Sequence, residues 1–192
     1  MGGQFGGGLR PDPLSNFPVP VYKRHSRFAA TSLRGFYLLQ KGIFPNGQIR
    51  RGSGTQAIDI NTETLVTFTT VVKDATADEA GGDPDFSMAS LSNERLYARV
   101  PGFYLAFAGV PWEIDPQSGA ARVRIKKNGS TFIASGLAGE SALINRVANA
   151  FTLIQMARDD YIEAWAYQEI DVSLNIVTGD GGPYLALTWV GL

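Results

Sequence analysis

The fold prediction depends on the stretch Arg95-Leu-Tyr-Ala-Arg-Val-Pro-Gly-Phe-Tyr-Leu-Ala-Phe-Ala-Gly-Val110. It contains two runs of apolar and aromatic residues separated by Pro101-Gly102, which is typical of two strands joined at a turn. In the second run the large residues Phe103, Leu105 and Phe107 alternate with mostly smaller ones. Because side chains alternate between the two faces of a strand, this strand is apolar on both faces.

Residues 56–192 have the pattern of an all-β domain. Short segments rich in β-branched and aromatic residues are separated by turn signals, which indicates a sandwich or jelly roll. Asn128-Gly129 predicts a tight hairpin, because both central residues of a type I′ turn need positive φ. The segment 139–151 fits a loop and strand or a short helix, and we expect the loop and strand. We expect strands at 65–72, 95–100, 102–110, 121–127, 131–135, 151–156, 161–168, 172–177 and 184–190.

The segment 95–107 resembles the "basic-x-aromatic-x-x-x-Pro-Gly-x-Tyr-x-Phe" signature of the complement globular-head and tumour necrosis factor superfamily. Four further features follow in the order found in that family. They are the hairpin 123–129, the strand-turn-strand 151–162 with Arg158 in place of the usual glycine, Gln168 at a strand end, and the closing segment 184–192. The resemblance covers residues 64–192 and implies a ten-stranded jelly roll that forms a threefold trimer.

The two-sided strands predict where a trimer would form. A sandwich strand in a monomer usually keeps one face polar, so a second apolar face is expected to lie against another copy of the chain. A monomer with an enlarged core is the alternative. We expect the trimer interface to contain Phe103, Tyr104, Leu105, Phe107, Tyr184, Leu187 and Trp189.

Residues 1–55 are expected to form an extended arm, with residues 56–192 as the head. The arm has eight basic residues and one acid, a charge of +7, whereas the head has nine basic and seventeen acidic residues, a charge of −8. Its prolines favour an extended path, and its aromatic residues need a surface to cover them, either the head itself or a neighbouring protein. We expect Phe17, Tyr22, Lys23, Arg24, Arg27, Phe28, Arg34, Phe36 and Tyr37 to dock on a partner.

Composition argues against most enzymatic chemistry. The chain has no cysteine and one histidine, His25, which lies among basic residues of the arm. Neither a thiolate site nor a two-histidine metal site can form within one chain. The acidic segment 74–85 could offer oxygen ligands to calcium, but its spacing is not that of an EF-hand, and a solvated loop is expected. We expect no enzyme activity, no metal and no cofactor.

Further partners are expected to be few. The charges of the arm are interleaved with prolines, so nucleic acid is not favoured as its partner. The apolar runs are too short to span a bilayer, and the first residues lack the features of a signal peptide, so neither a membrane partner nor export is expected.

These features together predict a structural protein of a tailed-bacteriophage virion, assembled in the host cytoplasm. Phage decoration proteins and fibres are known to resemble this jelly roll. In this hypothesis the trimer is a capsid decoration, cement or head-fibre protein, and its arms insert into capsid or tail proteins of the same virion. The alternative is a tail-fibre or recognition module of the same superfamily that binds a host surface receptor or a glycan.

Overall fold

The computed structural model of the 192-residue chain describes residues 44–75, 87–113, 119–138, 146–170, 172–178 and 181–192. The predicted arm residues up to Tyr37, His25 and most of the acidic segment 74–85 lie outside these ranges.

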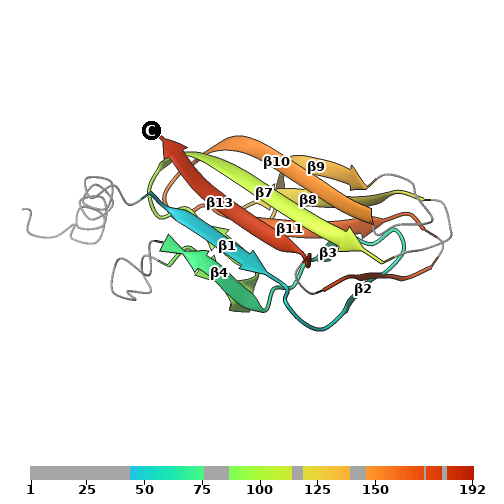
Figure 1. Ribbon diagram of the computed structural model, residues 1–192. Helices are drawn as coiled ribbons and strands as arrows, with labels where there is room; N and C mark the ends of the chain where they lie inside the picture. The colour runs from blue at the N-terminus through green and yellow to red at the C-terminus, as the bar shows by residue number, and fades with distance from the viewer. Residues whose placement is uncertain (1–43, 76–86, 114–118, 139–145, 171, 179–180) are drawn as a thin grey trace, which may run out of the picture.

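Two antiparallel sheets pack face to face (Figure 1). Sheet A contains β1 (Asn46–Arg50), β2 (Gln56–Ile58), β4 (Thr70–Asp74), β7 (Gly102–Trp112), β10 (Arg146–Met156), β12 (Leu174–Ile176) and β13 (Tyr184–Gly191). Sheet B contains β3 (Thr64–Leu65), β5 (Ala89–Ser90), β6 (Arg95–Tyr97), β8 (Ala121–Lys127), β9 (Thr131–Ala138) and β11 (Tyr161–Gln168). The strand order in sheet A is β2-β12-β7-β13-β1-β4, and β10 pairs with β7 along its whole length. The strand order in sheet B is β5-β6-β11-β8-β9, and β3 pairs with β11. The predicted all-β sandwich is therefore confirmed.

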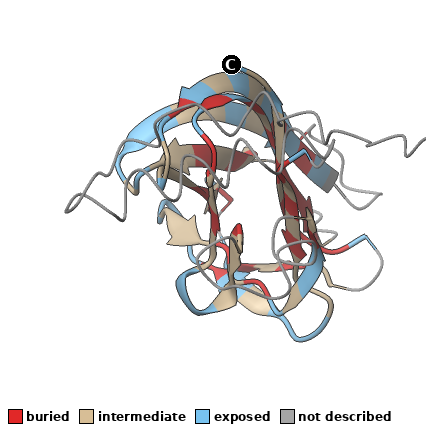
Figure 2. Ribbon diagram, turned by 90° about the vertical axis from the view of Figure 1, so that its left-hand side faces the viewer, coloured by how far each residue is buried: buried red, intermediate tan, exposed pale blue. Residues whose placement is uncertain are grey.

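The core lies between the sheets, where the buried residues gather (Figure 2). On β7 the large inward side chains Tyr104 and Trp112 stand near the two ends of the strand, with Ala106 and Ala108 between them. Alanines also occupy inward positions of the neighbouring and facing strands, namely Ala121, Ala138, Ala148, Ala150, Ala164 and Ala166. Small side chains at the centre let the sheets approach closely, so the core depends on shape as well as on apolar area.

The boundary predicted between arm and head, at residue 55, is too late in the chain. Asn46–Arg50 forms β1, which pairs with β13 on one side and with β4 on the other. Its inward residues are Gly47 and Ile49, and a Cβ at Gly47 would lie 3.0 Å from the Cβ of Met88. A strand with a glycine at one of its two core positions gives a weak hydrophobic signal, which is why the pattern did not reveal it.

The predicted strand 65–72 is also wrong in part. Thr64–Leu65 pairs with β11 in sheet B, whereas Thr70–Asp74 pairs with β1 in sheet A. Residues 66–69 cross between the sheets, so Val66 and Phe68 are buried without belonging to a ladder. A continuous apolar run therefore marked a crossing segment rather than one strand.

The tight turns agree with the sequence. Asn128 and Gly129 have φ of 52° and 74°, as the predicted type I′ hairpin between β8 and β9 requires. In the turn after β10, the residue with positive φ is Asp159 (67°), next to Arg158. Aspartate tolerates the left-handed region better than most residues, so this turn forms with Arg158-Asp159 and without a glycine.

Candidate assembly interface

The outer face of sheet A is apolar and carries no charge along its central strands. On β7 and β10 the outward side chains alternate with the buried ones, and those of Phe151 and Leu153 are 70% and 58% exposed. Among the described residues, the outward positions on β7, β10 and β13 are Phe103, Leu105, Phe107, Val147, Asn149, Phe151, Leu153, Gln155, Tyr184, Ala186 and Thr188. A continuous exposed apolar surface of this kind marks an interaction site.

Pairing between β7 and β10 brings the largest of these side chains together. Phe151 lies opposite Phe107, and Leu153 lies opposite Leu105. The rings of Phe107 and Phe151 are stacked, with centroids 6.0 Å apart and an interplanar angle of 24°. Stacking holds both rings in place on the surface before any partner arrives, which lowers the entropy that binding would cost.

Tyr184 forms the polar border of this surface. Its ring crosses the position of Gly109, where a Cβ would lie 2.6 Å from the ring carbon Cζ. The Tyr184 hydroxyl group is 3.1 Å from the Oδ1 atom of Asn149 and donates a hydrogen bond to it. Gly109 is needed here because the tyrosine ring must lie flat over the backbone.

Trp189 lies at the other end of this surface, beside Phe44, the first described residue. Its ring stacks on that of Phe44, with centroids 5.9 Å apart, and its Nε1 atom donates to the carbonyl oxygen of Pro101 at 3.3 Å. The N–H of Trp189 also donates to the Pro45 carbonyl oxygen at 2.8 Å. Phe44 and Pro45, the first described residues, therefore enter the head at the same end as the Pro101-Gly102 turn and the end of the C-terminal strand.

The structure divides the seven residues predicted for the trimer interface. Phe103, Leu105, Phe107 and Tyr184 point outward, and Trp189 is half-buried at the end of the face. Tyr104 and Leu187 instead point into the core and are fully buried, so neither is available to another copy of the chain. These two assignments are wrong because both residues occupy the inward phase of their strands.

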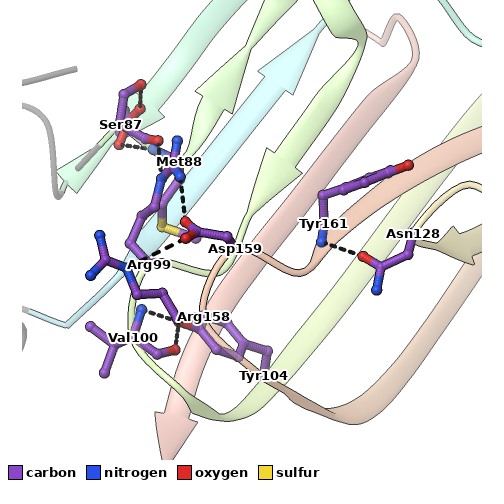
Figure 3. A network of polar contacts seen from close by, with 10 residues as sticks. Ser87, Met88, Arg99, Val100, Tyr104, Asn128, Arg158, Asp159 and Tyr161 are labelled. Carbon is purple, nitrogen blue, oxygen red and sulfur yellow. Dashed lines mark hydrogen bonds and ion pairs between the residues drawn. The ribbon is translucent and has the colours of Figure 1, made fainter. Parts of the chain in front are cut away.

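Tyr104 has a structural role in the core. Its hydroxyl group donates to the carbonyl oxygen of Val100 at 2.6 Å (Figure 3). Burial raises the pKa of Tyr104, because the charged phenolate would be poorly solvated there. This bond closes the segment between β6 and β7 over the end of the core.

Sequence reasoning missed the contribution of β10 to the surface. Val147, Phe151 and Leu153 are exposed, whereas Ala148 and Ala150 between them are buried. Large outward and small inward residues reverse the usual pattern of a sandwich strand. That reversal is visible in the sequence and could have identified the strand as part of an interface.

Sheet B presents a very different outer face. Its outward positions on β8 are Arg122, Arg124 and Lys126, and those on β11 include Glu163 and Trp165. Ion pairs and rings cover this side of the head, as expected of a face that stays in water. This contrast makes the outer face of sheet A, and not that of sheet B, the candidate assembly interface.

A polar network fastens the turns at the end of the head that the arm enters. The Arg99 guanidinium group lies 2.7 Å from the Asp159 carboxylate and donates to the Ser87 carbonyl oxygen at 2.6 Å. Asn128 accepts a hydrogen bond from the N–H of Tyr161 at 2.9 Å (Figure 3). Asp160 lies beside this network and accepts bonds from the side chain of Asn128 (2.8 Å) and the N–H of Ala157 (2.7 Å).

The stability of the head should fall in acid partly through Asp160. Burial acts to raise its pKa, but hydrogen bonds from Lys127, Asn128 and Ala157 outweigh burial and lower the pKa. A carboxyl group with a depressed pKa stabilises the folded state above its unfolded pKa, and this contribution disappears as pH falls through the folded value. We expect Asp160→Asn to lower the melting temperature at pH 7 and to flatten its decline below about pH 4. Thermal melts of both proteins across this range test the prediction, and curves with equal acid slopes would contradict it.

Asp74 is the one acidic residue of the segment 74–85 that the structure describes. Its carboxylate accepts hydrogen bonds from the Ser87 hydroxyl group (2.6 Å) and from the N–H groups of Met88 (3.1 Å) and Ala89 (3.0 Å). It therefore fastens β4 to the start of β5. Within the described ranges, no group of three or more His, Cys, Asp or Glu residues could hold a metal ion, and no helix is long and apolar enough to cross a membrane.

No protein-family model matches the chain, and no curated protein matches it. Among solved structures, the globular domain of zebrafish complement 1qA protein is similar over 74% of this chain and 94% of its own, with 13% identity and a TM-score of 0.49. Murine APRIL at pH 5.0 is similar over 77% of this chain and 99% of its own, with 9% identity and a TM-score of 0.52. At these identities the likeness shows the fold alone. The head is a jelly-roll sandwich of the tumour necrosis factor type, as the sequence predicted.

Proposed function

We propose that the chain is a non-enzymatic structural protein whose head assembles as a homotrimer through the outer face of sheet A. The observation that carries this proposal is the uncharged apolar surface on β7, β10 and β13, centred on the stacked rings of Phe107 and Phe151. Obligate interfaces have this core-like composition. The jelly-roll fold agrees with a closed threefold arrangement. The resemblance of residues 64–192 to the complement globular-head and tumour necrosis factor superfamily also implies a trimer.

The N-terminal segment 1–43 supports the proposal that this trimer is part of a virion. Residues 1–43 precede the head and combine glycines, prolines and basic residues with aromatic ones. Three such arms on one trimer would bind a particle together, with an avidity far above that of one arm. We propose that the trimer decorates the capsid of a tailed bacteriophage as a cement or head-fibre protein, with its arms inserted between particle proteins.

Two measurements on the intact chain and on a truncated chain test this function. The full chain should sediment at three times the 20.7 kDa mass of one chain at micromolar concentration. Removal of residues 1–43 should leave the trimer intact and abolish its attachment to particles. The cut must stop before Phe44, because Phe44 stacks on Trp189 and β1 follows directly. A stable 20.7 kDa species, or a truncated trimer that still joins particles, would overturn the respective part of the proposal.

A recognition module is the second candidate function, as in a tail fibre that contacts a host surface. The observation that favours it is the row of rings and charged side chains on the outer face of sheet B. Tyrosine, tryptophan and arginine are the residues that most often dominate binding energies at protein surfaces. A trimer closed through sheet A would leave three copies of this row exposed.

A further inference from the structure

The outer face of sheet B carries a straight row of cations. Arg122, Arg124 and Lys126 occupy alternate positions of β8 and all point away from the core. With a rise of about 3.3 Å per residue, the three side chains span about 13 Å along the strand. β8 lies between β9 and β11, so the row runs through the middle of a sheet rather than along an edge.

Aromatic rings from the neighbouring strands accompany each cation. The Lys126 ammonium group is 4.0 Å from the centroid of the Trp165 ring. The Arg124 guanidinium carbon is 5.0 Å from the centroid of Tyr167 and 5.7 Å from that of Phe132. These cation–π contacts hold the long side chains upright on the sheet, so less of their freedom remains to be lost on binding.

Carboxylates complete the face and limit its positive charge. Glu63 pairs with both Arg124 (2.7 Å) and Lys126, and Glu169 lies 3.4 Å from Arg122. The Arg122 and Glu169 side chains are 35% and 40% exposed, whereas those of Glu63, Arg124 and Lys126 are 27%, 27% and 15% exposed. An exposed pair such as Arg122–Glu169 is worth about 0–1 kcal/mol, so an arriving ligand can displace it.

We propose that this face binds an acidic polysaccharide, with the chain of the ligand lying along β8 and its carboxylates on Arg122, Arg124 and Lys126. A linear row of charges fits a linear polymer. The carboxylate of Glu169 would accept hydrogen bonds from sugar hydroxyl groups, and the edges of Trp165 and Phe132 would contact the apolar faces of the sugar rings.

The same features disfavour nucleic acid on this face. Phosphate backbones need a concentration of unpaired positive charge, whereas these cations alternate with carboxylates. Bases need open ring faces on which to stack, but Lys126 and Arg124 lie over the rings of Trp165 and Tyr167. A ligand whose many hydroxyl groups can bond to these carboxylates matches the face better.

Binding of the full chain to polygalacturonate tests the inference, with neutral dextran and poly(dT) as the comparison polymers. The wild-type chain should bind polygalacturonate and not dextran. Arg124→Gln should weaken binding about tenfold, the loss expected for one charge-assisted contact. Glu63→Gln should strengthen binding severalfold, because it removes the carboxylate that competes with the ligand for Arg124 and Lys126.

The gain expected for Glu63→Gln keeps the test independent of folding, since a damaged face would not bind more tightly. Lys73→Gln is the matched charge control, because Lys73 is an exposed residue of β4 in sheet A. It should leave affinity within about twofold of wild type, as expected for a screened distant charge. Failure of the wild type to bind polygalacturonate, equal losses in Lys73→Gln and Arg124→Gln, or tighter binding to poly(dT) would each overturn the inference. None of these outcomes depends on the trimer or on the arm.

Discussion

Leu153→Asp should convert the proposed trimer into single folded chains. Leu153 projects from β10 opposite Leu105, in the middle of the uncharged face of sheet A. In a trimer its side chain would be enclosed, and an aspartate there would lie in apolar surroundings without a partner cation. Burial of an unpaired carboxylate costs several kcal/mol, and threefold symmetry repeats that cost in every copy. Sedimentation at micromolar concentration should therefore report the mass of one chain.

Leu137→Asp is the matched control for this experiment. Leu137 is 61% exposed on β9, compared with 58% for Leu153 on β10, and it belongs to sheet B. Both substitutions place the same charge on an exposed leucine of a strand, so any shared effect on folding cancels. We expect Leu137→Asp to remain a trimer, and both variants to keep the circular dichroism spectrum of the wild type. Dissociation in both variants, or in neither, would refute the assignment of the interface to sheet A.

The parts of the fold that the sequence predicted are those with a strong local pattern. The strand 121–127 has strict alternation and ends at Asn128-Gly129, and the structure places β8 at the same residues. The strand 161–168 is likewise β11, and its last residue, Gln168, is tied by hydrogen bonds to the Ile58 and Val172 carbonyl oxygens. Where local preference and tertiary packing agree, periodicity alone is sufficient.

The errors arose where tertiary structure overrides that pattern. Asn46–Arg50 is a strand because β13 and β4 pair with it on both sides, although only Ile49 among its residues is strongly apolar. Residues 65–72 have a continuous strand-like composition, but the chain must cross between sheets at Val66 and Phe68. Pairing partners so distant in sequence cannot be inferred from the composition of the segment itself.

The candidate surfaces were predictable only in part for the same reason. The two-sided pattern of Phe103, Leu105 and Phe107 lies within one strand and was visible in the sequence. The cations and aromatic rings on the outer face of sheet B come from β8, β9 and β11. Their contacts depend on the register between these strands. Nothing in the segments around Lys126 and Trp165 reveals that the two residues meet.

Gly102→Ala should destabilise the head more than any other single methyl addition at the end where the arm enters. Gly102 has φ of +146°, a conformation that residues with a Cβ rarely adopt. A Cβ at this position would overlap the carbonyl oxygen of Gly191 and the Nε1 atom of Trp189. Strained backbone costs about 1–3 kcal/mol and overpacking costs a similar amount, so we expect a loss of about 2–6 kcal/mol in the free energy of unfolding.

The size of this loss matters because it approaches the whole stability of a typical domain, about 5–15 kcal/mol. The overlapped atoms belong to β13, whose Trp189 ring stacks on Phe44, so the damage should reach the point where the arm enters the head. Gly191→Ala is the matched control, since a Cβ there would meet no atom within 4 Å, and it should change stability by less than about 0.5 kcal/mol. Urea unfolding of the wild type and both variants measures the difference. Equal midpoints for Gly102→Ala and Gly191→Ala would mean that the Pro101-Gly102 turn can rearrange, and that glycine is not required where the strand β7 begins.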